Sequence, residues 1–158
     1  MQQGSVTALH LARIKGTPSE PVESARALSG QGLEGDRSCR ADNPRQVLVM
    51  DQETLDRFGL APGVVKENIT TRGLNLIDAR AGQVMFIGDE VTLELVGECI
   101  ACQKMNDIRP GLLDEIQGRR GMLAMVINGG EIKVGDTARV EPMLSQIRSE
   151  TGRFHSNE

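Results

Sequence analysis

Cys102 is the residue of this sequence best placed to do chemistry. It closes a Cys-x-x-Cys motif that begins at Cys99, after an alternating strand pattern and before a polar segment typical of a helical turn. Backbone N–H groups at a helix start and nearby cations both favour a thiolate over a thiol, and Lys104 and Arg109 follow closely. The position therefore predicts a reactive cysteine, with a small buried apolar side chain as the competing interpretation.

Other kinds of cysteine site need partners that this sequence does not supply. A structural zinc site takes four Cys or His ligands, but the three cysteines and two histidines include no second Cys-x-x-Cys and no close His pair. A thioredoxin-type site would lie in βαβ surroundings, and a cysteine protease needs a histidine beside its thiol. What is left is a thiol with cations nearby and no base, which suits a persulfide sulfur or a soft metal ion.

Composition narrows the classes of protein and partner. A length of 158 residues corresponds to one domain, and the odd number of cysteines without a signal-peptide pattern predicts a cytoplasmic protein. No apolar run reaches the roughly 20 residues of a membrane helix, so we expect no membrane association. A net charge of −4 and only three aromatic residues disfavour nucleic acid as a partner.

Short strands separated by glycines make up most of the pattern. Asp51 is a candidate N-cap for a short helix that ends near Gly59, and residues 111–116 predict another helix. Alternating or compact apolar runs predict strands at residues 6–14, 21–28, 45–50, 67–71, 84–87 and 91–95.

The fold class follows from these elements. Asn128-Gly129, between apolar runs at residues 122–127 and 131–134, predicts a tight β-hairpin. Many short strands with only two or three short helices predict a mainly β protein, a closed or nearly closed β-barrel. We expect this single domain at residues 1–142 and a polar, mobile tail at residues 143–158.

Motifs that occur in order along the chain resemble those of the MOSC domain, named after the C-terminal part of molybdenum-cofactor sulfurases. The resemblance runs from about residue 6 to residue 142 and is greatest to small stand-alone bacterial members. Many members have His after the Gly-Asp-Arg motif, whereas this chain has Ser38 and then Cys39. The motifs are Gly-Leu-Glu-Gly-Asp-Arg at 32–37, Arg-Gln-Val-Leu at 45–48, Glu-Asn-Ile-Thr-Thr-Arg-Gly-Leu at 67–74, Gly-Asp at 88–89, Cys102, Arg-Pro-Gly-Leu at 109–112 and Gly-Arg-Arg-Gly-Met at 118–122.

The resemblance implies a barrel fold and a role for one thiol. In the family this cysteine, here Cys102, is suggested to carry sulfur taken from a pyridoxal-phosphate-dependent cysteine desulfurase, or to ligate molybdenum. The chain has no desulfurase portion, so a separate desulfurase and a sulfur-accepting protein or cofactor are the implied partners. Cys99 is either a resolving thiol that closes a disulfide with Cys102 or a packing residue.

Five further residues are candidates for cofactor binding. Guanidinium groups bind oxyanions through paired hydrogen bonds, so arginines suit the phosphate of a pterin-type ligand. The competing interpretation for each arginine is an ordinary surface ion pair, and Asp36 is expected to brace its own turn. The candidates are Arg37, Arg45, Asn68, Arg119 and Arg120.

Two functions stay open, and a third involves no thiol chemistry. The first is a sulfur carrier in molybdenum-cofactor or metal–sulfur cluster metabolism, with a sulfurtransferase-type activity that depends on the desulfurase. The second is a molybdopterin-binding module or small oxidoreductase with Cys102 as the molybdenum ligand. The third is a barrel that binds another small anion or a protein, in which case a Cys102→Ala variant would stay fully active.

Overall fold

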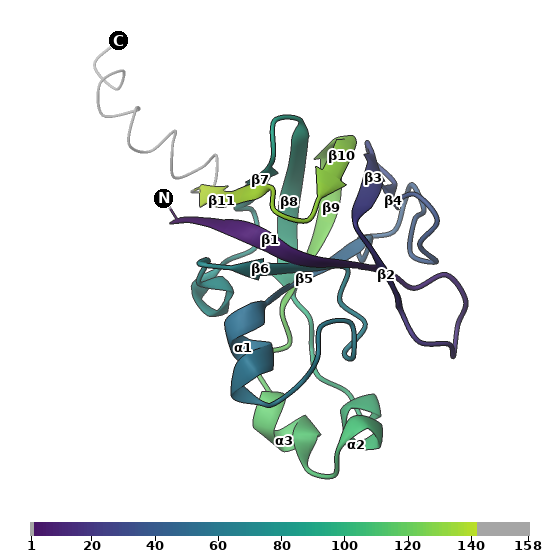
Figure 1. Ribbon diagram of the computed structural model, residues 1–158, viewed down its shortest axis with the longest axis vertical. Helices are drawn as coiled ribbons and strands as arrows, with labels where there is room; N and C mark the ends of the chain where they lie inside the picture. The colour runs from purple at the N-terminus through teal and green to yellow at the C-terminus, as the bar shows by residue number, and fades with distance from the viewer. Residues whose placement is uncertain (1, 142–158) are drawn as a thin grey trace.

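A closed barrel of seven strands forms the centre of the computed structural model, which describes residues 2–141 (Figure 1). Its strands follow the order β11, β7, β8, β9, β5, β6 and β1, and the pairing of β1 with β11 closes the ring. All neighbours are antiparallel except β5 and β6, which are parallel. The bounds are β1 Gln2–Leu11, β5 Val47–Asp51, β6 Ile69–Arg72, β7 Val84–Ile87, β8 Val91–Glu98, β9 Met122–Asn128 and β11 Thr137–Glu141.

The barrel interior is a packed apolar core. The strands alternate between inward and outward side chains, so residues such as Val49, Ile69, Leu93 and Ala124 are completely buried. The mainly β barrel predicted from the sequence is confirmed. The strand at residues 84–87 has the predicted bounds, and the strands expected at 45–50 and 91–95 correspond to β5 and β8.

A second sheet of three strands packs beside the barrel, and it corrects two predictions. The strand expected at residues 21–28 is divided into β2 (Glu20–Val22), which pairs with β1, and β3 (Ser24–Leu28), which belongs to the second sheet with β4 (Gly32–Leu33). The hairpin expected around Asn128 is wrong, because β10 (Gly130–Lys133) pairs with β3 and not with β9. The sequence indicates the turn at Asn128-Gly129. It does not indicate the partner strand of β10, which is β3, about a hundred residues earlier in the chain.

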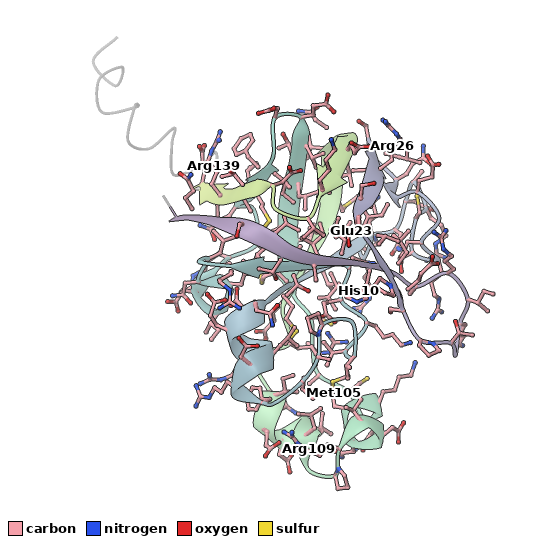
Figure 2. The ribbon with its side chains drawn as sticks, in the orientation of Figure 1. His10, Glu23, Arg26, Met105, Arg109 and Arg139 are labelled. Atoms are coloured by element: carbon pink, nitrogen blue, oxygen red, sulfur yellow. The ribbon has the colours of Figure 1, made fainter. Side chains whose placement is uncertain are left out.

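Three short helices cover one end of the barrel (Figure 1). They are α1 (Gln52–Arg57), α2 (Lys104–Ile108) and α3 (Leu112–Ile116), and a 3-10 turn forms at Leu76–Asp78. Figure 2 shows Met105 and Arg109 within this end. A separate apolar cluster holds it together, with Met50, Leu55, Leu60, Val65, Ala101, Met105, Leu112 and Ile116 as its buried members.

Arg109 ties the helical end to the chain after α1. Its guanidinium donates to the carbonyl of Phe58 at 2.6 Å and pairs with Glu115 of α3 at 2.7 Å. Asp51 stands at the N-cap position of α1, as predicted, but its side chain makes no capping hydrogen bond there. Its carboxylate instead accepts from the backbone N–H of Leu76 at 3.3 Å.

The predicted tail at residues 143–158 lies outside the described residues. Within the described part of the chain, no helix is long and apolar enough to span a membrane.

Candidate functional site

A polar cavity of about 170 Å³ lies where the loops at residues 12–17 and 36–38 meet the barrel. We call it the thiol pocket. Four of the described residues that line it are basic, namely Arg37, Arg45, Lys66 and Arg120. Its wall also includes Asp36, Asn68 and Cys99. The structure thus brings together five of the seven site residues predicted from the sequence.

Asp36 and Asn68 hold the wall of the thiol pocket in place. The Asp36 carboxylate accepts from the backbone N–H groups of Ala12 at 2.7 Å and Ser38 at 3.0 Å. The Asn68 amide donates to the same carboxylate at 3.0 Å and accepts from the Leu48 N–H at 3.0 Å. The expectation that Asp36 braces its own turn is confirmed, and with its acceptor oxygens occupied it is a scaffold of this pocket.

Cys99 is the buried thiol of the pocket. Arg45 lies two residues before β5, and its guanidinium is 3.8 Å from the Sγ of Cys99. The backbone N–H of Cys99 donates to the carbonyl of Gly121 at 2.8 Å. This bond fixes the end of β8 against the start of β9 and directs the sulfur toward the cations.

Arg120 is the buried cation of the pocket, with 8% of its surface exposed. Its Nη2 donates to the carbonyl of Val65, while Nη1 has no hydrogen-bond partner among the described residues. Burial lowers the pKa of Arg120, and Cys99, Glu67 and Cys102 oppose that shift by electrostatic attraction. Arg120 therefore interacts electrostatically with both cysteines of the Cys-x-x-Cys motif.

Cys102 is exposed, in contrast to Cys99. Its carbonyl accepts from the Met105 N–H at 2.9 Å, which starts the turn into α2, so the predicted helical turn after the cysteine is confirmed. Ile100, between the two cysteines, is 75% exposed. This loop presents both a thiol and an apolar side chain to solvent.

The third thiol, Cys39, is half-buried and does not line the pocket. Burial raises its pKa, and the negative charges of Asp36 and Glu34 add to that shift. These causes keep the Cys39 sulfur protonated and so reduce its nucleophilicity.

Two of the seven predicted residues, Cys102 and Arg119, do not line the thiol pocket. Arg119 lines another cavity. Lys66 was missed, although it directly precedes the Glu67-Asn68 motif. Its backbone has a φ of 68°, a left-handed conformation unusual for lysine, and its ammonium donates to the Thr17 carbonyl at 2.5 Å.

Sequence analysis also missed a buried polar cluster under the pocket. Glu67 is completely buried, and its Oε2 accepts from the Gly63 N–H at 2.8 Å while Oε1 has no partner among the described residues. Burial raises the pKa of Glu67 and lowers that of His10. His10, seen near the middle of Figure 2, packs against Gly63, where a Cβ would collide with its ring.

The donor set of the thiol pocket fits a phosphate-bearing cofactor. Arginine and lysine supply charge-assisted hydrogen bonds to phosphate oxygens, and the unpartnered Nη1 of Arg120 leaves one buried donor free. A cysteine thiolate is a ligand that soft metal ions accept. Arg37, Arg45 and Lys66 would hold the anionic group, and Cys102, which lies outside the pocket lining, would supply the sulfur ligand.

The fold and this pocket define a class of protein, a small barrel domain with a thiol in a cavity lined by four cations. The model of the MOSC domain family matches residues 36–139, the greater part of the chain. The chain therefore belongs to the MOSC domain family. Membership supports a coarse assignment as a sulfur-using domain related to the molybdenum cofactor, with which the family is associated.

Solved structures share the fold at low sequence identity. The YuaD protein of Bacillus subtilis superposes with a TM-score of 0.73 at 19% identity, over 89% of this chain and 98% of that one. YiiM of Escherichia coli gives a TM-score of 0.67 at 19% identity, over 91% and 71% of the two chains. YiiM of Geobacillus stearothermophilus gives 0.68 at 18% identity, over 98% and 86%. No curated protein matches the chain significantly.

Proposed function

We propose that this protein is a sulfur carrier that holds a persulfide on Cys102, within molybdenum-cofactor or metal–sulfur cluster metabolism. One observation carries the proposal: the exposed Cys102 thiol, which is not part of the pocket lining, interacts electrostatically with Arg120, one of the four cations that line the thiol pocket. An exposed thiol can meet a donor protein, and a fixed cation favours the thiolate that must attack.

The loading step needs only a persulfide donor, which a separate cysteine desulfurase would supply. The Cys102 thiolate attacks the terminal sulfur of the enzyme's cysteine persulfide and forms a new S–S bond. The old S–S bond breaks, and the enzyme's cysteine leaves as a thiolate. Electrons balance without an added oxidant, because the transferred sulfur keeps its oxidation state. We expect this exchange in the cytoplasm, where thiols are kept reduced.

The pocket gives each neighbour of Cys102 a role in this proposal. The terminal sulfur of a persulfide is anionic, so Arg120 would stabilise the loaded form by electrostatic attraction. Cys99, held 3.8 Å from Arg45, would attack the Sγ of Cys102, form the Cys99–Cys102 disulfide and release the terminal sulfur to the acceptor as hydrosulfide. A dithiol reductant would then return the disulfide to two thiols. The exposed Ile100 would contact the donor or acceptor protein.

The second candidate function is that of a molybdopterin-binding module or small oxidoreductase. The observation that favours it is the excess of cations in the thiol pocket, where the described lining includes one carboxylate, Asp36, that is already hydrogen-bonded. When bound, the cofactor would supply a molybdenum centre for redox chemistry. The residues of this chain would bind its anionic group and, through Cys102, present a sulfur ligand.

Label transfer tests the carrier proposal. The purified protein is incubated with a cysteine desulfurase and ³⁵S-labelled cysteine, and bound label is counted before and after reduction. We expect label that a thiol reductant releases, lost in Cys102→Ser and retained in the matched control Cys39→Ser. Equal labelling of Cys102→Ser and the unmodified sequence would contradict the proposal.

Metal and pterin content distinguishes the second candidate. After mild purification, the sulfur carrier should hold neither group in stoichiometric amount, while a cofactor-binding module should hold both and lose them in Cys102→Ser. Stoichiometric molybdenum without label transfer would favour the cofactor-binding function over the carrier.

A further inference from the structure

A second cavity has a volume of about 380 Å³ and is lined partly by residues that are adjacent in sequence to residues of the thiol pocket. No residue lines both cavities. The second cavity lies between α1, the 3-10 turn at Leu76–Asp78 and the junction of β8 with β9. We call it the Asp51 pocket. Residues that are adjacent in sequence line different cavities. Glu98 lines the Asp51 pocket, and Cys99 lines the thiol pocket. Arg119 and Arg120 are divided in the same way.

Asp51 is an incompletely bonded carboxyl in the wall of this pocket. It is 6% exposed, its Oδ2 accepts from the Leu76 N–H at 3.3 Å, and its Oδ1 has no partner among the described residues. A buried acceptor without a donor is costly, since it has lost its hydration. A ligand that donates an N–H group to Oδ1 would remove this cost.

The other charges of the Asp51 pocket are also free. Arg80, Glu98 and Arg119 line it, and within the described residues their side chains form no ion pair or hydrogen bond. The lining thus offers two carboxyl groups and two guanidinium groups. This balance differs from the thiol pocket, where four cations favour an anion. A molecule with one charge of each sign complements the Asp51 pocket.

The remaining surface of the pocket accepts an apolar group. Leu76, Ile77 and Met122 contribute aliphatic side chains, and Ile77 is 47% exposed. The small residues Gly97, Gly118 and Gly121 also line the pocket and leave room for a ligand. A volume of about 380 Å³ lies within the range of small-molecule sites.

We infer that the Asp51 pocket binds a small zwitterion, a free amino acid or a dipeptide with an aliphatic side chain. Its ammonium donates to Asp51, its carboxylate pairs with Arg80 and Arg119, and its side chain contacts Met122 and Ile77. This site is separate from the sulfur chemistry proposed for Cys102 and does not depend on it.

The protonation of Asp51 gives the inference a pH dependence. Burial, with a smaller contribution from Glu53, raises the pKa of Asp51 to about 7. The ammonium binds the ionised carboxylate, so affinity should rise as the pH rises from 6 to 8. The other charged groups of the lining are Arg80, Glu98 and Arg119, and Glu53 of α1 acts on Asp51 from the first turn of that helix.

Calorimetric titration of the full chain tests the site, with L-leucine and L-alanyl-L-leucine as probes. N-acetyl-L-leucine lacks the ammonium and L-leucinamide lacks the carboxylate, so each should bind at least roughly tenfold more weakly. The probe that binds more tightly shows whether the natural ligand is an amino acid or a dipeptide. Failure of both zwitterions to bind at millimolar concentration would overturn the inference, as would equal binding of the blocked compounds.

Variants assign the binding to this pocket. Asp51→Asn should weaken binding roughly tenfold and remove its pH dependence, and Arg119→Gln should weaken it to a similar extent. Arg119 lines the pocket and is only half-buried. If Asp51→Asn does not fold, Arg119→Gln therefore decides the test. The control Cys102→Ser should bind as the unmodified sequence does. Unchanged affinity in Arg119→Gln would contradict the inference.

Discussion

The thiol pocket and the Asp51 pocket use one stretch of chain to build two different electrostatic environments. The first collects four cations around a buried thiol, and its carboxylate, Asp36, is occupied by hydrogen bonds. The second has two carboxyls and two arginines that form no ion pair with other described residues. The difference shows that the net charge of −4 does not predict the charge of either site, because the residues that line each cavity set its local charge.

The separation arises where β8 meets β9. Cys99 donates to the carbonyl of Gly121, so the end of β8 lies beside the residues that lead into β9. Arg119 and Arg120, which lie in this connection, line different cavities. Variants in this region should affect the two pockets separately or together, according to which cavity lining they change.

The largest effect is expected for Gly121→Ala, which changes the support of both pockets. Gly121 has a φ of 99°, and a Cβ there would overlap the carbonyl oxygen of Val49. The strained backbone and the displaced strand should lower the free energy of unfolding by about 3 kcal/mol, measured by urea denaturation. Gly118→Ala is the matched control, because a Cβ at its φ of 76° meets no atom, and it should cost about 1 kcal/mol. Equal losses would contradict the account of the junction.

Next in size is the contrast between Arg120→Gln and Arg119→Gln. Arg120→Gln removes the cation that interacts with Cys102 and Cys99, so the rate of sulfur loading should fall roughly tenfold to a hundredfold. Arg119→Gln should leave that rate unchanged and weaken binding of the zwitterion. Circular dichroism checks that each variant is folded. A loss of sulfur loading in both variants would remove the distinction between the pockets.

A smaller effect concerns the pH dependence of stability. The pKa of Asp51 rises from 3.8 in an exposed carboxyl to about 7 in the folded protein, chiefly through burial. The folded state therefore binds a proton that the unfolded chain has released, and stability due to this group falls as the pH rises from about 4 to 7. The Asp51→Asn variant lacks this titration. Its free energy of unfolding should therefore fall by about 1 kcal/mol less between pH 5 and pH 8 than that of the unmodified sequence, after allowance for solvent screening.

Urea denaturation of both proteins at pH 5 and pH 8 measures this change. Glu67, whose pKa burial also raises, contributes with the same sign but is present in both proteins. An identical pH dependence in Asp51→Asn and the unmodified sequence would show that Asp51 is ionised throughout.

The smallest effect is expected at the edge of the thiol pocket. Arg45 is exposed and reaches Cys99 at 3.8 Å, so Arg45→Gln should slow sulfur loading only roughly twofold to fivefold. Cys39→Ser should have no effect, since Cys39 does not line the pocket. A tenfold loss in Cys39→Ser would make this third thiol part of the site.

Local patterns predicted the strands and the class of fold well, but not every strand partner. Residues 84–87 form β7 as expected because a compact apolar run bounded by glycines has few alternatives. The pairing of β10 with β3 was not predictable from Asn128-Gly129, because a turn signal does not say which sheet the next strand joins.

The site shows the same limit. The residues near Cys102 and the family motifs predicted most of the thiol pocket, including Arg45 and Asn68. Adjacent arginines in a connection cannot be assigned to separate cavities from the sequence, so Arg119 was not distinguished from Arg120. The role of Asp51 was hidden as well, because an acidic residue before a helix is usually a cap, whereas here its carboxylate bonds to Leu76.

Fragment-ion mass spectrometry after desulfurase treatment tests the central claim most directly. Trypsin leaves Cys99 and Cys102 on one peptide, since no Lys or Arg occurs from residue 81 to residue 103, so fragment ions must locate the added sulfur. We predict one additional sulfur atom on Cys102, with none on Cys39 or Cys99. Added sulfur on Cys99 alone, or equally on all three cysteines, would contradict the assignment of Cys102 as the carrier.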